Sequence, residues 1–271
     1  MKSLVTGASG FIGRNLMKIM PKDTIAMVRK ELPGYECVIC DLEHADKLPE
    51  LVGNVDVIYH LAWTGASGAN RDDDTIQEIS KNNSLRLAEA AVKIGCRKFI
   101  FCGTIAEREK AASPYTTAKR DTAKMISGIC SKNGIQFAHA ILPSTYGEGS
   151  SGFITKVFEK MISGSDVTAD NGCGLNDFLY VSDVVNGLKM IGEKGTGEFF
   201  IGSGKPRKIS DFINTMAKIT DSSSKVEIRP GAPTLTAEDL SIDALSAIGY
   251  VPAVEFEDGI KRMINLSRSS T

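Results

Sequence analysis

The chain lacks a strong charge of either sign and lacks long hydrophobic runs. Its 271 residues carry a formal net charge of −1 at pH 7, so no basic surface suggests binding to nucleic acid or to an anionic membrane. No apolar run approaches the ~18 residues that span a bilayer. Met1 and Lys2 lead directly into a strand pattern, which leaves no room for a signal peptide. We therefore expect a cytoplasmic protein.

The sequence also offers little for a metal or redox site. Its 3 histidines are scattered, and most of its 6 cysteines fall in apolar runs, where cysteine behaves as a small core residue. Cys37 and Cys40 have C-x-x-C spacing, but they share one expected strand, and residues i and i+3 of a strand point to opposite faces. We expect no metal site and no disulfide between them.

Short β-branched runs alternate with longer helical patterns in the first half of the chain, which is typical of a parallel α/β sheet. Strands are expected at residues 2–6, 24–28, 36–40, 55–59, 98–102 and 136–141, and helices at 11–20, 74–94 and 115–131. We predict a Rossmann-type doubly wound parallel sheet over residues 1–143, to which residues 178–202 return. Residues 144–177 and 203–271 are expected to form a smaller C-terminal lobe that binds the substrate.

A glycine-rich turn follows the first expected strand and precedes a helix. In such a turn the glycines let the backbone approach a pyrophosphate, and the helix N-terminus offers free N–H groups and the positive end of its dipole. The alternative is an ordinary turn, but the position at the first strand-to-helix connection favours a dinucleotide site. The residues expected to contact the dinucleotide here are Gly7, Ser9, Gly10, Phe11, Ile12 and Gly13.

The end of the second expected strand bears on which dinucleotide is bound. NAD sites usually place an acidic residue there, whereas an arginine can accept the 2′-phosphate of NADP. This chain has Arg29 and Lys30, with no acid before Glu31, so we expect NADP rather than NAD. The alternative is a solvated basic pair with Glu31 turned back. Asp41, after the third strand, is placed either to meet the adenine ring or to cap a turn.

Tyr115 and Lys119 lie four residues apart in an expected helix, so their side chains share one face. A free tyrosine has a pKa of ~10, and a nearby cation favours the phenolate. We therefore expect Lys119 to lower the pKa of Tyr115 and to make its phenol an acid/base near neutral pH. Thr104 lies eleven residues upstream. The spacing alone arises often by chance on helix surfaces.

A series of motifs extends over nearly the whole chain. They are the glycine turn, Asp41-Leu42, His60-Leu61-Ala62-Trp63, Thr104, the pair Tyr115 and Lys119, Tyr146-Gly147-Glu148-Gly149, residues 177–184, Arg229-Pro230-Gly231 and Gly249-Tyr250-Val251-Pro252. In this order they resemble the extended short-chain dehydrogenase/reductases of the NAD(P)-dependent epimerase/dehydratase group, which modify nucleotide-activated sugars.

The resemblance implies a role for each member of the central group. Hydride would pass between a substrate carbon and the nicotinamide while Tyr115 transfers the proton. Lys119 would hold the nicotinamide ribose, and Thr104 would hydrogen-bond the reacting oxygen. Further cofactor contacts are expected from Arg29, Asp41, Leu42, Leu61 and Ala62.

Two departures from the family pattern limit the chemistry. Ile105 and Ala106 stand where sugar dehydratases have Asp and Glu, so elimination of water is not expected. Glu107, one residue later, is expected either in a loop or behind the residues that touch the substrate. Asn176 stands where many relatives have an arginine for the substrate diphosphate, which removes a charge-assisted contact. Arg229 matches a second such arginine, or is a solvated loop residue.

Trp63 opens a loop that either closes over a sugar ring or only packs. The expected substrate contacts are Trp63, Thr104, Tyr115, Asn176 and Arg229. We predict an NADP-linked reductase of a keto group, at C4, on a nucleotide-activated sugar. The alternatives are a 4-epimerase with tightly held NAD and a catalytically silent dinucleotide sensor. The resemblance also suggests a homodimer through the helices at 74–94 and 115–131.

Overall fold

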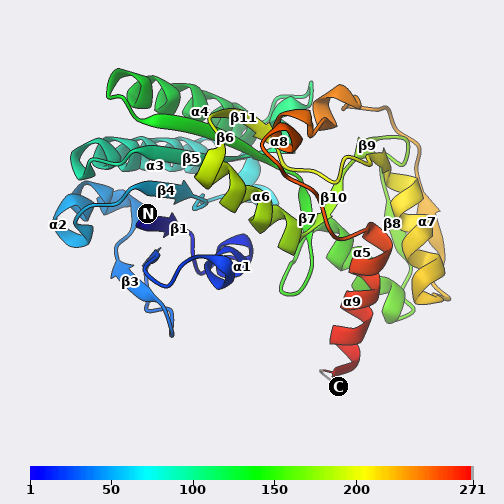
Figure 1. The fold of residues 1–271 in the computed structure, drawn as a ribbon. Coiled ribbons are helices and arrows are strands. Elements are labelled where there is room, and N and C mark those ends of the chain that lie inside the picture. Colours follow the sequence, from blue (N-terminus) through cyan, green and yellow to red (C-terminus); the bar gives the residue numbers. More distant parts are fainter. Residues whose placement is uncertain (270–271) are drawn as a thin grey trace. The chain divides into compact units, whose positions relative to one another are not determined.

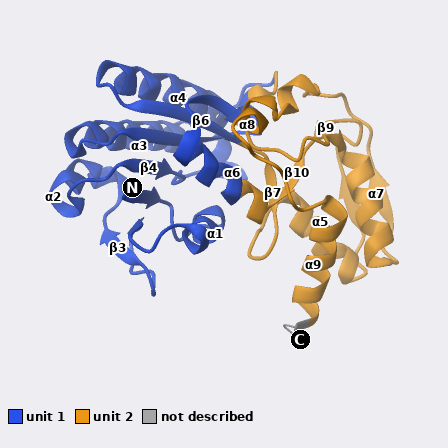
Figure 2. Ribbon diagram, in the orientation of Figure 1, with its two compact units in different colours: residues 1–107, 111–141, 185–199 blue, residues 108–110, 142–184, 200–271 orange. Residues whose placement is uncertain are grey.

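The computed structural model describes residues 1–269. The chain divides into two compact units, shown in separate colours in Figure 2. The first, which we call the sheet unit, comprises residues 1–107, 111–141 and 185–199. The second, the C-terminal unit, comprises residues 108–110, 142–184 and the chain from residue 200 onward. Each unit is described by itself.

The sheet unit is built on a seven-stranded sheet with the order β11-β6-β5-β4-β1-β2-β3 (Figure 1). Its strands are β1 (Ser3–Thr6), β2 (Ile25–Val28), β3 (Glu36–Ile39), β4 (Val57–His60), β5 (Lys98–Thr104), β6 (Gln136–Leu142) and β11 (Gly197–Phe200). β1 pairs in parallel with both β2 and β4. The chain therefore proceeds outward from β1 in one direction through β3 and in the other from β4. This is the predicted doubly wound Rossmann-type fold, which is confirmed.

Helices and 3-10 turns connect these strands. They are α1 (Phe11–Ile19), η1 (Leu42–Lys47), α2 (Leu48–Val52), η2 (Gly68–Asp72), α3 (Asp74–Ile94), η3 (Ile105–Arg108), α4 (Pro114–Lys132) and α6 (Val181–Lys194). α3 begins where the Asp73 carboxylate accepts the Ile76 N–H, and it ends at Gly95 with φ 76°. α4 begins with a capping box between Ser113 and Thr116, which satisfies free N–H groups of its first turn.

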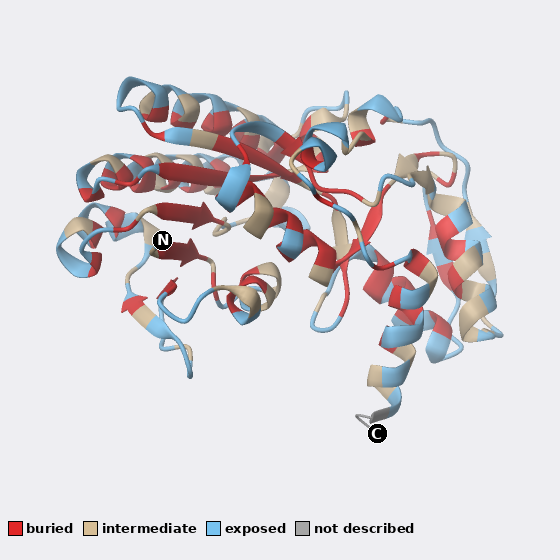
Figure 3. Cartoon of the chain, viewed as in Figure 1, coloured by how far each residue is buried: buried red, intermediate tan, exposed pale blue. Residues whose placement is uncertain are grey.

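The core of the sheet unit lies along its central strands. Leu4 on β1, Ile58 on β4 and Phe99 on β5 are all fully buried, as Figure 3 shows for these strands. Strands covered on both faces appear in the sequence as continuous apolar runs. Within residues 1–269, no helix is long and apolar enough to cross a membrane, and no group of three or more His, Cys, Asp or Glu side chains could hold a metal ion.

The C-terminal unit consists of short elements. They are β7 (Ser144–Tyr146), α5 (Phe153–Ile162), β8 (Val167–Ala169), β9 (Leu175–Asn176), β10 (Phe178–Tyr180), β12 (Arg207–Lys208), α7 (Ile209–Thr220), β13 (Val226–Ile228), η4 (Glu238–Leu240), α8 (Asp243–Ala247) and α9 (Phe256–Ser269). The strands form three two-stranded ribbons, β10-β7, β12-β9 and β13-β8. The many glycines and short apolar runs after residue 149 correspond to these elements.

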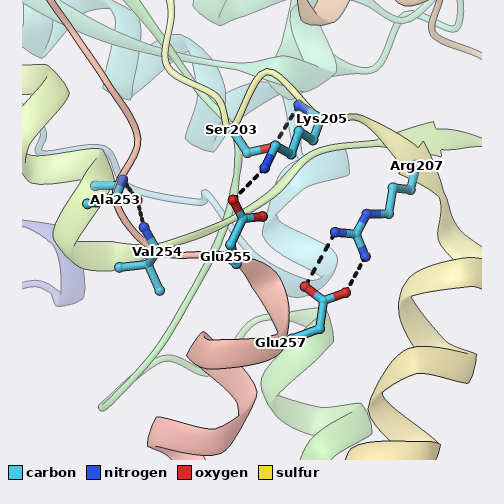
Figure 4. Close-up of polar contacts among 8 residues, drawn as sticks. Ser203, Lys205, Arg207, Ala253, Val254, Glu255 and Glu257 are labelled. Carbon is cyan, nitrogen blue, oxygen red and sulfur yellow. Dashed lines mark hydrogen bonds and ion pairs between the residues drawn. The ribbon is translucent and has the colours of Figure 1, made fainter.

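One buried carboxylate holds the segment that leads into α9. Oδ2 of Asp183 accepts the N–H groups of Ala253 and Val254 at 2.9 and 2.8 Å. Next to this segment, Lys205 pairs with Glu255 at the surface (Figure 4). The buried hydrogen bonds of Asp183 and the exposed ion pair of Glu255 therefore involve neighbouring residues of the same segment. Their contributions to stability can be compared in one protein.

We predict that Asp183→Ala lowers the free energy of unfolding by about 2–4 kcal/mol, because it leaves two backbone N–H groups without an acceptor. Urea unfolding followed by circular dichroism measures this change. Glu255→Gln is the control, since breaking an exposed ion pair costs less than ~1 kcal/mol. Equal losses in the two variants would contradict the assignment.

Candidate active site

A cavity of about 450 Å³ lies at the carboxyl ends of the central strands of the sheet unit. Its lining residues are Thr6, Gly7, Ser9, Gly10, Met27, Val28, Arg29, Cys40, Asp41, Leu42, Leu61, Ala62, Trp63 and Thr64. They come from the carboxyl ends of β1 and β2 and from the segments that follow β1, β2, β3 and β4. In open parallel sheets, ligands bind at this edge, where the direction of winding reverses.

Two glycines make the wall of this cavity possible. Gly7 has φ +69°, and a Cβ there would lie 2.9 Å from the Ala62 nitrogen. A Cβ on Gly13 would lie 2.1 Å from the Gly7 oxygen. Glycine at both positions therefore lets β1, the end of β4 and α1 pack closely. Gly10 precedes α1 without any side-chain cap, so N–H groups of the first turn are free to meet an anion.

Most residues predicted to bind the cofactor line this cavity. They are Gly7, Ser9, Gly10, Arg29, Asp41, Leu42, Leu61 and Ala62. Phe11, Ile12 and Gly13 belong to the first turn of α1 and Lys119 to α4, outside the lining set. The prediction omitted Met27, Val28 and Cys40, although their positions at strand ends are a signal that could have found them. The free N–H groups, the glycine-shaped wall and the size of the cavity fit a dinucleotide.

Thr104, Tyr115 and Lys119 come together in the sheet unit. Thr104 ends β5, and Tyr115 and Lys119 lie on the buried face of α4, with exposed fractions of 7% and 4%. The Thr104 hydroxyl interacts with the Tyr115 phenol and acts to lower its pKa. The Lys119 ammonium donates to the Cys102 carbonyl oxygen at 2.8 Å. A hydroxyl, a phenol and a cation thus meet beside the end of one central strand.

The prediction that Lys119 lowers the pKa of Tyr115 is wrong. The lysine side chain extends to the Cys102 carbonyl, and its Nζ lies 4.1 Å from the Trp63 ring centroid. The cation over the Tyr115 ring is Arg71, 4.6 Å from the centroid. Burial raises the pKa of Tyr115, and Arg71 and the Thr104 hydroxyl offset only part of that increase. Tyr115 is therefore a protonated phenol at neutral pH.

The pKa of Lys119 is itself shifted strongly. Burial lowers its pKa to about 8, which the negative charge of Glu107 partly opposes. The Nζ also lies 4.8 Å from the Phe101 ring centroid. Two aromatic faces and one carbonyl therefore replace the water that would normally solvate this ammonium group.

The loop that follows β4 is held from α3. The amide of Gln77, only 1% exposed, accepts the Trp63 indole N–H at 2.9 Å. It donates to the carbonyl oxygens of Gly65 and Asn70 at 2.9 and 2.8 Å. The loop therefore presents Trp63 and Arg71 in a defined arrangement next to Tyr115. Sequence reasoning missed Gln77 and Arg71, since neither belongs to a motif.

His60, in the motif after β4, has a structural role. Its Nδ1 lies 2.8 Å from the Thr6 hydroxyl, and its Nε2 lies 2.9 Å from the Ser84 hydroxyl. Complete burial lowers its pKa to about 3. A neutral ring that links β1, β4 and α3 accounts for this histidine without any catalytic function.

Asn176 and Arg229 belong to the C-terminal unit. The Asn176 side-chain oxygen accepts the Asp177 N–H at 2.8 Å. Arg229 is exposed and pairs with Asp170 and Glu227 at 3.3 and 3.5 Å. Across the β9–β12 ribbon, Asn176 is opposite Arg207. The prediction did not include Arg207.

Arg207 lines a second cavity, of about 250 Å³, together with Lys205. Figure 4 shows both side chains engaged with acidic partners: Arg207 contacts Glu257 at 2.6 Å, and Lys205 contacts Glu255. Both cations of this cavity are therefore already neutralised.

The buried charge of Lys119 leads to a prediction on stability. Its pKa in the folded protein is about 8, against 10.5 for an ordinary lysine. The folded state therefore releases the proton first, so this group makes stability rise with pH between those values. We predict that Lys119→Met raises the free energy of unfolding at pH 7 by about 1–3 kcal/mol and removes this rise.

Chemical unfolding at pH 7 and pH 9.5 measures both effects. Lys124→Met, at an exposed position of the same helix, is the control and should show neither. A Lys119→Met protein that is less stable than the wild type at pH 7 would contradict the assignment of a buried, costly charge.

Comparison with known proteins finds relatives that are similar to this chain over nearly its whole length. CDP-abequose synthase from Salmonella muenchen is 24% identical, with 98% of this chain and 97% of the relative covered. UDP-glucose 4-epimerase from Mycolicibacterium smegmatis is 24% identical over 100% of both chains.

A solved structure, UDP-glucose 4-epimerase from Thermus thermophilus in complex with NAD, has a TM-score of 0.84 with 20% identity and covers 100% of each chain. The model of the NAD dependent epimerase/dehydratase family matches residues 3–202. This match extends over most of the chain and includes the glycine turn and the Tyr115–Lys119 pair. The protein therefore belongs to the NAD dependent epimerase/dehydratase family and is an NAD(P)-dependent enzyme.

Proposed function

We propose that the protein is an oxidoreductase acting on a nucleotide-activated sugar, and that it reduces a keto group at C4. The observation that carries this proposal is the group formed by half-buried Thr104 and buried Tyr115 and Lys119 beside the end of β5. The substrate class is supported by two relatives at 24% identity, whose names contain CDP-abequose and UDP-glucose.

The residues divide the chemistry among them. Reduced NAD(P), held in the cavity that the glycine turn lines, would supply the hydride. Tyr115 donates its phenolic proton to the oxygen that becomes a hydroxyl, while the Thr104 hydroxyl orients that oxygen. The Lys119 ammonium supplies a fixed positive charge at the site. Because burial keeps Tyr115 protonated at neutral pH, the free protein is prepared to give a proton, which is what reduction requires.

The residues after Thr104 limit the alternatives. Ile105 and Ala106 both have apolar side chains, so neither can remove or donate a proton for elimination. The carboxylate of Glu107 accepts the Thr104 backbone N–H at 2.7 Å, so this carboxylate is already engaged. Simple hydride exchange at one carbon remains the supported reaction.

A 4-epimerase is the second candidate. Two of the proteins named above are UDP-glucose 4-epimerases, and the one with a solved structure is a complex with NAD. An epimerase must both remove and return a proton at one oxygen, which favours a tyrosine with a pKa near neutrality. The raised pKa of Tyr115 favours the reductase. A silent dinucleotide sensor would not need Thr104, Tyr115 and Lys119 together.

One observation supports NAD as the bound dinucleotide, and another supports NADP. The similar structure with NAD favours NAD over the NADP that we expected. Arg29 lines the cavity at the end of β2, a position where an arginine accommodates a 2′-phosphate. The Asp41 side chain accepts the Glu43 N–H at 3.4 Å, so it also caps η1. We propose that the site binds NAD and that Arg29 sets its tolerance for NADP.

Contacts of the C-terminal unit with the substrate are proposals as well. Arg229 would exchange its two exposed carboxylate partners for the substrate diphosphate, and Asn176 would contribute an amide N–H group. A homodimer through α3 and α4 also stays a prediction, for which exposed Ile79 and Met125 offer apolar surface on the two helices.

Turnover of nucleotide-activated 4-keto sugars, followed by the loss of reduced-nicotinamide absorbance, tests the function. We predict that Tyr115→Phe lowers kcat by at least ~100-fold, because it removes the proton donor. Tyr35→Phe, at a half-exposed tyrosine, is the control and should keep wild-type turnover. Unchanged turnover in Tyr115→Phe would overturn the proposed mechanism, and tightly bound NAD without consumption of reduced cofactor would favour the epimerase.

Arg29 provides a test of dinucleotide recognition. We predict that Arg29→Ala weakens binding of NADP by about tenfold, because it removes a charge-assisted contact to the 2′-phosphate, and leaves binding of NAD nearly unchanged. Titration calorimetry with both dinucleotides measures the two affinities. Lys30→Ala is the matched control. Equal losses for NAD and NADP would show that Arg29 does not read the 2′-phosphate.

A further inference from the structure

Behind Thr104, two titratable side chains are buried against each other. Glu107 in η3 and His139 on β6 have side chains only 3% and 10% exposed. Oε1 of Glu107 accepts the Thr104 N–H at 2.7 Å. Its Oε2 faces Nε2 of His139 at 3.3 Å. In the described part of the chain, neither of these two facing atoms has the geometry of a hydrogen bond to any group, the other atom included.

The second ring nitrogen of His139 also faces a carboxylate. Its Nδ1 lies 3.4 Å from Oε2 of Glu198, whose side chain is 55% exposed. β6 lies between β11, which carries Glu198, and β5, which leads into η3. Carboxylates only accept hydrogen bonds, and only the doubly protonated imidazolium presents N–H groups on both sides. A carboxylate therefore faces each nitrogen of the ring, and the charges of both carboxylates favour the protonated imidazolium.

The sequence makes room for this arrangement at one residue. A Cβ on Gly103 would lie 2.3 Å from His139 Nε2 and 2.6 Å from Glu107 Oε1. From α4, Arg120 donates to the Glu107 backbone oxygen at 2.7 Å and fixes η3. A glycine on β5 and an arginine on α4 thus support the same pair from two sides.

We propose that Glu107 is a positioning residue for the reaction and that the His139 imidazolium holds it in place. Glu107 fixes the backbone of Thr104, and its negative charge acts on Tyr115 and Lys119. Glu198 connects the pair to solvent. The residues reach the substrate only through Thr104, Tyr115 and Lys119, so they do not touch the reacting atoms.

The charges around this pair define its expected effect. Tyr115 is faced by Arg71 from η2 and by Glu107 from η3, and the negative charge of Glu107 raises its pKa. Glu107 also raises the pKa of Lys119. The two carboxylates raise the pKa of His139 above its ordinary value, although burial opposes this. Removing the Glu107 charge should therefore lower all three pKa values.

The variant Glu107→Gln tests the proposal, because it keeps the side-chain size and an oxygen that can accept the Thr104 N–H. Histidine ring NMR signals of the protein without substrate, assigned with His139→Gln, report the pKa of His139. We expect it to lie above that of an ordinary histidine in the wild type. In Glu107→Gln we expect it to fall below that value, because burial then acts with one carboxylate fewer.

Tyrosine ionisation gives a second readout that needs no substrate. Phenolate absorbance, with Tyr115→Phe as the blank, should show Tyr115 ionising at lower pH in Glu107→Gln than in the wild type. Glu89→Gln, at an exposed position of α3, is the control and should change neither titration. Unchanged titrations of both His139 and Tyr115 in Glu107→Gln would overturn the proposal.

The kinetic readout rests on the proposed function. We expect Glu107→Gln to lower kcat by about ten- to hundredfold with little change in KM, and to move the alkaline limb of the kcat profile to lower pH. Wild-type kcat and an unmoved limb would overturn the positioning role. If the wild type turns over no nucleotide-activated sugar, the proposed function fails, and the two titrations still decide the coupling.

Discussion

The buried ammonium group of Lys119 is the constraint on which the site depends. A cation inside a protein needs replacements for water, and here they are the Cys102 carbonyl, two aromatic rings and the more distant charge of Glu107. β5 supplies the carbonyl, and the loop after β4 supplies Trp63. The positions of β5 and of the loop after β4 are therefore tied to one charge. We infer that this costly arrangement is kept for chemistry rather than for stability.

The sequence predicted the architecture because its signals are local. The glycine turn has no room for a Cβ at Gly7 and Gly13, where β1, β4 and α1 pack closely. Only glycine fits there, and the spacing of glycines is visible in a sequence. Buried parallel strands appear as apolar runs for the same reason. Family membership and the Rossmann-type fold are confirmed. The roles of individual site residues stay predictions, although most of the expected cofactor contacts line one cavity.

The electrostatics of the site could not be predicted in the same way. The i, i+4 spacing places Tyr115 and Lys119 on one face, but it does not say where a long lysine side chain ends. Its partner, the Cys102 carbonyl, and the cation over Tyr115, Arg71, come from other elements. Glu107 and His139 are far apart in sequence and meet only because β6 lies beside β5. Such contacts are properties of the folded chain, and no spacing rule contains them.

The central claim is that hydride reaches a sugar carbon beside a protonated Tyr115. The most direct measurement is the mass of the sugar product formed from a nucleotide-activated 4-keto sugar and reduced cofactor that carries deuterium at both positions of the nicotinamide C4. The account predicts a product that carries one deuterium at its new hydroxyl-bearing carbon. A reduced product without deuterium, or complete retention of the label in the cofactor while the sugar is converted, would contradict it.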